Sequence, residues 1–204
     1  MSNEKKPKTA MQRNLVLAQM GVLSALIVVM TFTHVGYITI GALSITLVHI
    51  PVIVGACVLG WQLGAALGGV WGVTCMIKAF AMPTAPTDPL FMNPLVSLVP
   101  RVLVGIVAGL LFALILKADK KGLLAAAVAA IAATVCNTAL VLTALYLIYG
   151  GSKGDLLGIQ AVSFPGLVKF IVAVFVSNAV FEVIAAVVIA IPAVYALRKV
   201  KTRI

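Results

Sequence analysis

The stretch LSITLVHIPVIVGACVLGWQLGAALGGVWG (residues 43–72), followed by NPLVSLVPRVLVGIVAGLL (residues 93–111), decides the fold of this chain. Glycines recur every fourth residue in its first part, at Gly60, Gly64, Gly68 and Gly72. In lipid, helices associate by close packing, and small residues let their backbones approach. The second part carries Arg101 inside an apolar run, and a cation there marks a candidate functional site because lipid solvates charge poorly.

The composition of the whole chain is that of a membrane protein. Its 204 residues are 63% hydrophobic and only 10% charged, which excludes an ordinary soluble domain. The first apolar run lacks a small-residue cleavage site followed by a polar domain, so we expect it to stay as a transmembrane helix. We expect an all-α integral membrane protein, one domain with a six-transmembrane-helix bundle over residues 14–197. Its segments are 14–33, 45–59, 62–82, 94–116, 122–149 and 164–197.

The basic residues predict the orientation of this bundle. Most of the fifteen Lys and Arg lie in the tail 1–13, the short loop 117–121 and the tail 198–204. The positive-inside rule places these three regions in the cytoplasm, and six crossings agree with an N-in/C-in topology in the cell membrane. The net charge of +10 therefore reflects topology and attraction to membrane lipid, and we expect no nucleic-acid partner.

The connections on the predicted outer side differ from the inner turns. They cover residues 34–44, 83–93 and 150–163, and they are longer and rich in Gly, Pro, Thr and Ser. Residues 34–44 are β-branched and flanked by glycine, which is compatible with a short hairpin, whereas three prolines stiffen 83–93. Long loops over a small bundle predict a lid above an outward-facing pocket.

The quoted stretch resembles the substrate-binding (S) components of energy-coupling factor (ECF) vitamin transporters, over residues 14–116, and most closely the pantothenate type. The resemblance implies that the subunit binds a vitamin from outside and releases it inside once docked on a membrane coupling subunit with two cytoplasmic ATPases. The docking motif of the family, an Ala-xxx-Ala pair on the first helix, falls here on Gly21 and Ala25, with Ala18 nearby. The chain has no Walker sequence, so we expect a non-catalytic subunit without a cofactor.

Arg101 is the leading candidate for ligand binding, because a guanidinium offers a two-pronged donor that matches a carboxylate. Ser97 lies one turn away on the same helix face. The alternative is a structural brace, in which Arg101 pairs with Glu182 or with carbonyl groups such as the one that Pro100 frees.

Other candidates are polar or aromatic residues in the predicted bundle and its outer mouth: Asn93, Asn137, Thr138, Lys169, Asn178, Trp71 and His49. Each also has a structural interpretation. Asn93 is suited to capping a helix, Lys169 to reaching the membrane interface, and His49 to packing in the core. Asn178 shares a helix face with Glu182.

The positive charge of Arg101 and Lys169 favours a ligand with a carboxylate. Pantothenate, with one carboxylate, two hydroxyls and an amide, suits Arg or Lys beside Asn and Thr. Biotin and folate satisfy the same charge argument, while 7% aromatic content disfavours riboflavin. A stand-alone secondary carrier or channel is the other alternative, although no internal repeat is visible. The three cysteines stand alone in apolar runs without paired histidines, so we expect no metal site.

Overall fold

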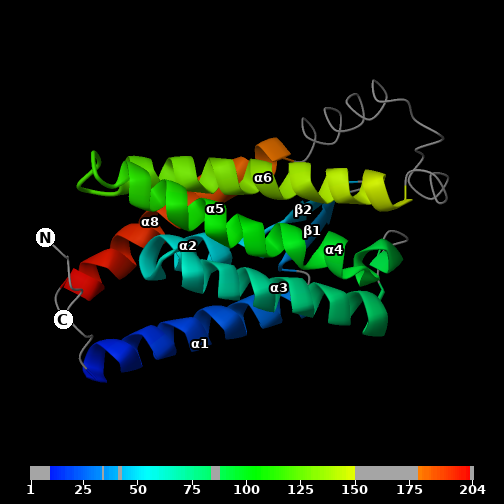
Figure 1. Cartoon of the computed structure of the whole chain (residues 1–204), viewed down its shortest axis with the longest axis horizontal. Coiled ribbons are helices and arrows are strands. Elements are labelled where there is room, and N and C mark those ends of the chain that lie inside the picture. The colour runs from blue at the N-terminus through cyan, green and yellow to red at the C-terminus, as the bar shows by residue number, and fades with distance from the viewer. Residues whose placement is uncertain (1–9, 34, 41–42, 84–87, 150–178, 203–204) are drawn as a thin grey trace, which may run out of the picture.

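The computed structural model describes residues 10–33, 35–40, 43–83, 88–149 and 179–202, which form a helical bundle (Figure 1). Its helices are α1 (Ala10–Phe32), α2 (His49–Leu59), α3 (Trp61–Ala81), α4 (Pro94–Ser97), α5 (Val99–Ile115), α6 (Leu123–Tyr149) and α8 (Val180–Thr202), with a 3-10 helix η1 (Asp88–Met92). Two short strands, β1 (Tyr37–Ile40) and β2 (Leu43–Thr46), complete it. The all-helical fold class is confirmed, and the strands are an antiparallel hairpin with Tyr37 opposite Thr46, as the composition of residues 34–44 suggested.

Five described stretches are long and apolar enough to cross a membrane: Ala10–Phe32, Trp61–Ala81, Pro94–Ile115, Leu123–Leu145 and Val180–Lys199. The predicted spanning segment 45–59 is not one continuous helix in the structure. Its first residues belong to β2, and α2 starts only at His49. At 1.5 Å per residue, the 11 residues of α2 span about half of a bilayer core of roughly 30 Å. Figure 1 shows α2 in one half of the bundle and the hairpin in the other, so both share the path of one spanning segment.

Glycines on the facing sides of α3 and α5, here called the glycine seam, let these two helices pack closely. The seam consists of Gly64, Gly68 and Gly72 on α3 and of Gly105 and Gly109 on α5. A Cβ on Gly68 would collide with the carbonyl of Arg101, and one on Gly105 would collide with the backbone of Gly64. The two helices therefore touch backbone to backbone, as small residues permit in lipid. The predicted role of these glycines in internal packing is confirmed.

The connection between α2 and α3 is a single residue. Gly60 adopts a φ of 101°, in the left-handed region that favours glycine, and α3 starts at the next residue. This tight reversal agrees with the short turn predicted at this position. It fixes α2 beside α3, and every residue of α2 except Leu59 is buried.

The basic regions meet at one end of the bundle, here called the basic end. The start of α1, the loop between α5 and α6, and the end of α8 all lie there (Figure 1). Arg198 donates a hydrogen bond to the carbonyl of Lys121, which ties α8 to the loop. In the same loop, Asp119 accepts from the backbone N–H of Ala125 at the start of α6, and this bond lowers the pKa of Asp119.

The two outer helices extend into the predicted tails. α1 begins at Ala10, inside the tail 1–13, and α8 continues to Thr202, inside the tail 198–204. Arg198, Lys199 and Lys201 lie in the last turns of α8. Basic side chains stabilise the C-terminal end of a helix because their charge complements the helix dipole, so these residues favour the extension of α8. The predicted beginning of this last segment, residues 164–178, lies outside the described residues.

Candidate ligand site

Arg101 lies in the first turn of α5, just after a break in the helix. The break separates α4 from α5 at Leu98, and Pro100 follows within the first turn. Proline has no N–H, so the carbonyl of Val96, four residues earlier, loses its usual helical donor. The Nη1 atom of Arg101 donates to that carbonyl, and the side chain is buried. This hydrogen bond fits the brace interpretation, and a role of Arg101 in ligand binding stays a prediction.

Two aromatic rings hold the rest of the guanidinium. Its central carbon lies 5.1 Å from the ring centre of Trp71 on α3 and 5.2 Å from that of Phe91 on η1. Such contacts attract a cation to the ring face. The Nε atom of Arg101 has no hydrogen-bond partner within the described ranges. Arg101 is thus fixed in position while part of its donor capacity is unused.

His49 and Trp71 add further unsatisfied polar atoms beside Arg101. Both side chains are 1% exposed, and their ring centres are 6.4 Å apart. Neither ring nitrogen of His49, nor Nε1 of Trp71, has a partner of strict hydrogen-bond geometry among the described residues, although the backbone of Thr46 lies near His49 and the side chain of Tyr37 lies near Trp71. Buried polar atoms are nearly always paired, and an unpaired one costs about 1–3 kcal/mol. The three residues, here called the polar cluster, can therefore offer donors and acceptors to a bound molecule.

Residues that the sequence did not single out as ligand candidates surround the polar cluster. The Tyr37 hydroxyl lies 3.1 Å from Sγ of Cys75, and Nζ of Lys78 lies 4.1 Å from the Tyr37 ring centre. The Tyr37 hydroxyl and the Cys75 thiol can each act as donor or acceptor in this contact. Lys78 lies in the last turn of α3, so this contact attaches the hairpin to α3. The only sequence signals for Tyr37 and Phe91 were aromatic side chains within polar connections.

Glu182 holds the other strand of the hairpin. It is buried near the start of α8, and its Oε1 accepts from the backbone N–H of Thr46 at 2.7 Å. The sequence offered Glu182 as an ion-pair partner for Arg101, but the structure gives it this backbone donor instead. β1 is therefore bound to α3 by Lys78, and β2 to α8 by Glu182.

The polar groups of three candidates form hydrogen bonds with the protein backbone. Asn93 accepts from the backbone N–H of Leu95 and caps α4, as its structural interpretation predicted. The hydroxyl of Ser97 donates to the carbonyl of Gly72 across the glycine seam, and that of Thr138 donates to Thr134 within α6. Their contribution to a ligand site stays a prediction.

Of the remaining candidates, one lies among the described residues and two lie outside them. Asn137 is buried on α6, which packs against α5, and its Oδ1 has no partner among the described residues. No described contact joins Asn137 to the polar cluster. Lys169 and Asn178 lie outside the described residues.

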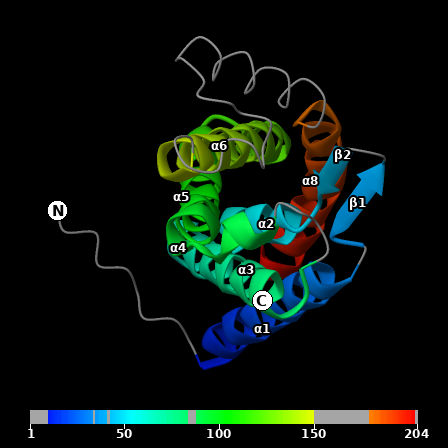
Figure 2. The same cartoon turned by 90° about the vertical axis from the view of Figure 1, so that its right-hand side faces the viewer.

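The small residues of α1 lie away from the core. Ala18, Gly21 and Ala25 are all exposed, and a Cβ on Gly21 would meet nothing within 4 Å. Only 11% of the apolar window of α1 is buried, compared with 44% for α3 and α6, and α1 lies at the edge of the bundle (Figure 2). This face is therefore available to another membrane component.

The polar cluster has the chemistry of a binding site for an anion that also carries hydrogen-bonding groups. Among the described residues, no group of three or more His, Cys, Asp or Glu side chains is arranged to hold a metal ion. A guanidinium, an imidazole and an indole N–H can offer positive charge and hydrogen bonds to a ligand.

Comparison with known proteins agrees with this fold. The profile of the family "ECF transporter, substrate-specific component" matches residues 15–194. The pantothenic acid transporter PanT of Lactococcus lactis subsp. cremoris is 36% identical over 153 residues, covering 66% of this chain and 74% of the relative. The pantothenate transporter PanT of Leuconostoc mesenteroides is 35% identical over 81 residues, which is 38% of this chain and 40% of that protein.

A solved structure resembles the bundle along nearly its whole length. ThiT from Listeria monocytogenes superposes with a TM-score of 0.57 and covers 94% of this chain and 97% of its own. The two sequences are 18% identical, so the likeness shows the fold alone.

Proposed function

The chain belongs to the ECF transporter substrate-specific components, which are non-catalytic, and from that membership we propose that it binds pantothenate for import. The two PanT relatives support this choice of vitamin. The observation that carries it is the polar cluster, where Arg101, His49 and Trp71 keep buried polar atoms unpaired. A ligand that pairs these atoms recovers the free energy that their burial costs.

The groups of pantothenate match the polar cluster one by one. Its carboxylate would pair with the guanidinium of Arg101, whose planar fork suits two oxygens. Its hydroxyl and amide groups would pair with the ring nitrogens of His49 and with Nε1 of Trp71. The β1–β2 hairpin and η1 would act as the lid, since Tyr37 and Phe91 already lie against the residues of the cluster.

Release would depend on partners. In this proposal the exposed face of α1 with Ala18, Gly21 and Ala25 docks on a membrane coupling subunit, which two cytoplasmic ATPases drive. Exposure of that face and the absence of packing against Gly21 support the assignment. The basic end would face the cytoplasm, in line with the positive-inside rule.

Binding to the purified subunit tests the choice of vitamin. In detergent, calorimetry should show pantothenate binding without ATP, and saturating vitamin should raise the melting temperature, since ligand at 100 times its Kd stabilises by about 2.7 kcal/mol. Biotin, folate and riboflavin are the matched comparisons. No heat and no thermal shift with pantothenate, together with a response to another vitamin, would reassign the substrate.

Transport in liposomes tests the mode of action. Uptake of labelled pantothenate should require the coupling subunit, both ATPases and ATP. Uptake by this chain alone, at the same rate, would identify a stand-alone carrier instead.

A further inference from the structure

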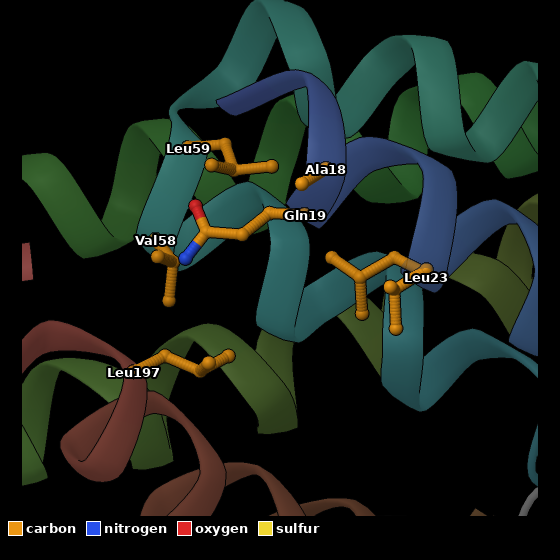
Figure 3. Close-up of a pocket in the computed structure, with 7 residues that line it drawn as sticks. Ala18, Gln19, Leu23, Val58, Leu59 and Leu197 are labelled. Carbon is orange, nitrogen blue, oxygen red and sulfur yellow. The ribbon is translucent and has the colours of Figure 1, made fainter. Parts of the chain in front are cut away.

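The groove at the basic end offers an anion no route to the polar cluster. This largely apolar groove of about 310 Å³ lies between α1, α2 and α8, and Figure 3 shows Val58, Leu197 and Gln19 in its lining. No charged side chain lines the groove, and none of its lining residues belongs to the polar cluster. An approach of the vitamin to Arg101 from the opposite end of the bundle is therefore favoured.

Lys78 places a second cation between that opposite end and the polar cluster. It lies in the last turn of α3, and α3 ends away from the basic end (Figure 1). Lys78 follows Trp71 by seven residues, so it lies about 10.5 Å further along the helix and, at about 3.6 residues per turn, on nearly the same face. The proposed vitamin site does not use this cation.

The face of α3 that carries Lys78 points into the bundle. Trp71 and Cys75 on this face are buried. The opposite face carries Ile77 and Phe80, which are 50% and 63% exposed, as expected for a face toward lipid. Lys78 itself is partly buried. Its position favours a role inside the bundle over that of an anchor reaching along the lipid surface.

Tyr37 of β1 lies between Lys78 and the polar cluster. The ring of Tyr37 is below the ammonium group, with its centre 4.1 Å from Nζ of Lys78. At the other end of the same side chain, the hydroxyl lies 3.1 Å from Sγ of Cys75 and near Trp71. Nζ of Lys78 has no hydrogen-bond or ion-pair partner among the described residues, so its three N–H donors are available to an anion.

We propose that Lys78 is the first residue to meet the carboxylate of the vitamin, and that Tyr37 separates this outer position from Arg101. The inference rests on the proposed function. A fixed charge on the approach to a site concentrates ligands of opposite sign and raises their association rate. The carboxylate would draw the ammonium group off the Tyr37 ring and then pass to the guanidinium of Arg101 as the hairpin moves aside. Lys78 therefore sets the rate of capture and favours anionic vitamins, while Arg101 sets how long the vitamin stays.

Capture of the vitamin and attachment of the hairpin affect different rate constants. Losing a charge that attracts the ligand lowers kon and its dependence on salt, whereas loosening the hairpin over a bound ligand raises koff. Stopped-flow binding of pantothenate to the purified full chain in detergent measures both rate constants. The Debye length is about 30 Å at about 10 mM salt and about 3 Å at about 1 M, so the two conditions reveal and screen the attraction.

Removal of the charge should slow capture only at low salt. Lys78→Gln should lower kon about fivefold, which is the effect of the attraction between unit charges about 4 Å apart in water, and should match the unmodified protein at high salt. Lys78→Arg keeps the charge and should retain kon. Lys120→Gln, which removes an exposed cation at the basic end, is the matched control and should leave kon unchanged.

Equal kon values for Lys78→Gln and the unmodified protein at low salt would overturn the role in capture. A change confined to koff would overturn it too, and would leave Lys78 as an attachment of the hairpin only. Absence of pantothenate binding by the unmodified protein would instead refute the choice of vitamin, and the same rates would then be compared with biotin and folate. Binding of an uncharged vitamin alone, such as riboflavin, would overturn this proposal as well.

Discussion

The guanidinium carbon of Arg101 on α5 lies 5.1 Å from the ring centre of Trp71 on α3. The contact depends on Gly68, one turn before Trp71, because the carbonyl of Arg101 occupies the space where a Cβ at that position would be. The glycine seam therefore does more than pack α3 against α5. It brings the cation of one helix to the aromatic ring of the other.

Adding one methyl group to the seam should disturb both stability and binding. In Gly68→Ala, the new Cβ must push against the Arg101 backbone, and overpacking of this kind costs about 1–3 kcal/mol. We expect a lower melting temperature in detergent together with weaker vitamin binding. Gly21→Ala is the matched control, since its surroundings are open. Equal melting temperatures for Gly68→Ala and Gly21→Ala would contradict the claim that close packing at Gly68 stabilises the bundle.

Replacing the guanidinium by an amine should weaken vitamin binding while the positive charge remains. Arg101→Lys loses the two-pronged geometry and one charge-assisted hydrogen bond, which is worth about 1.5–3 kcal/mol, or about 10- to 150-fold in Kd. Calorimetry with pantothenate measures the change. Arg198→Lys at the basic end is the control, and an unchanged Kd in Arg101→Lys would leave Arg101 as a brace only.

Removing a single indole N–H should weaken vitamin binding. Trp71→Phe keeps an aromatic ring near Arg101 but deletes Nε1, which has no partner of strict hydrogen-bond geometry among the described residues. The smaller ring leaves space at a buried position, so the melting temperature of the ligand-free protein should fall, and Kd is measured on the fraction that remains folded. Loss of a neutral hydrogen bond to the vitamin, about 0.5–1.5 kcal/mol, should raise Kd about two- to tenfold.

The comparison for this change is Trp61→Phe, which makes the same substitution in an exposed side chain at the start of α3. Identical Kd values for the two variants would show that Nε1 of Trp71 does not touch the vitamin.

Freeing the hairpin should speed vitamin release. Glu182→Ala removes the acceptor that holds the Thr46 N–H and leaves that donor without its partner, which costs about 1–3 kcal/mol. We expect the dissociation rate of pantothenate, measured by stopped flow or filter binding, to rise about fivefold or more. Glu182→Gln retains a neutral acceptor, so its dissociation rate should lie between those of the unmodified protein and Glu182→Ala. Equal rates in these three proteins would mean that the hairpin does not cover the ligand.

Local chemistry made several features predictable. Glycine at every fourth position indicated the seam, and β-branched residues between glycines indicated the hairpin. Pro100 removes one N–H from the helix, so a free carbonyl near Arg101 could be expected without knowing how the helices cross. These features depend on a few consecutive residues, or on one helix face.

The neighbours of Arg101 could not be predicted in the same way. Phe91 and Trp71 reach it only because η1 folds over the end of α5 and α3 crosses beside it, and no spacing in the sequence encodes that meeting. The second segment was also difficult, since an apolar run of this length is compatible with a strand or a helix. The chain uses both, with β2 ending at Thr46 and α2 starting at His49.

The weak attachment of α1 has a consequence for how this kind of protein diversifies. A helix with so little of its surface packed against the rest of the fold can change its outward face without disturbing the α3–α5 seam or the polar cluster beside it. Grafting α1 from one family member onto the body of another should then transplant compatibility with the energising machinery while leaving the choice of cargo to the recipient. Recognition of cargo and recognition of partner would thus be inherited as separate modules of a single small bundle.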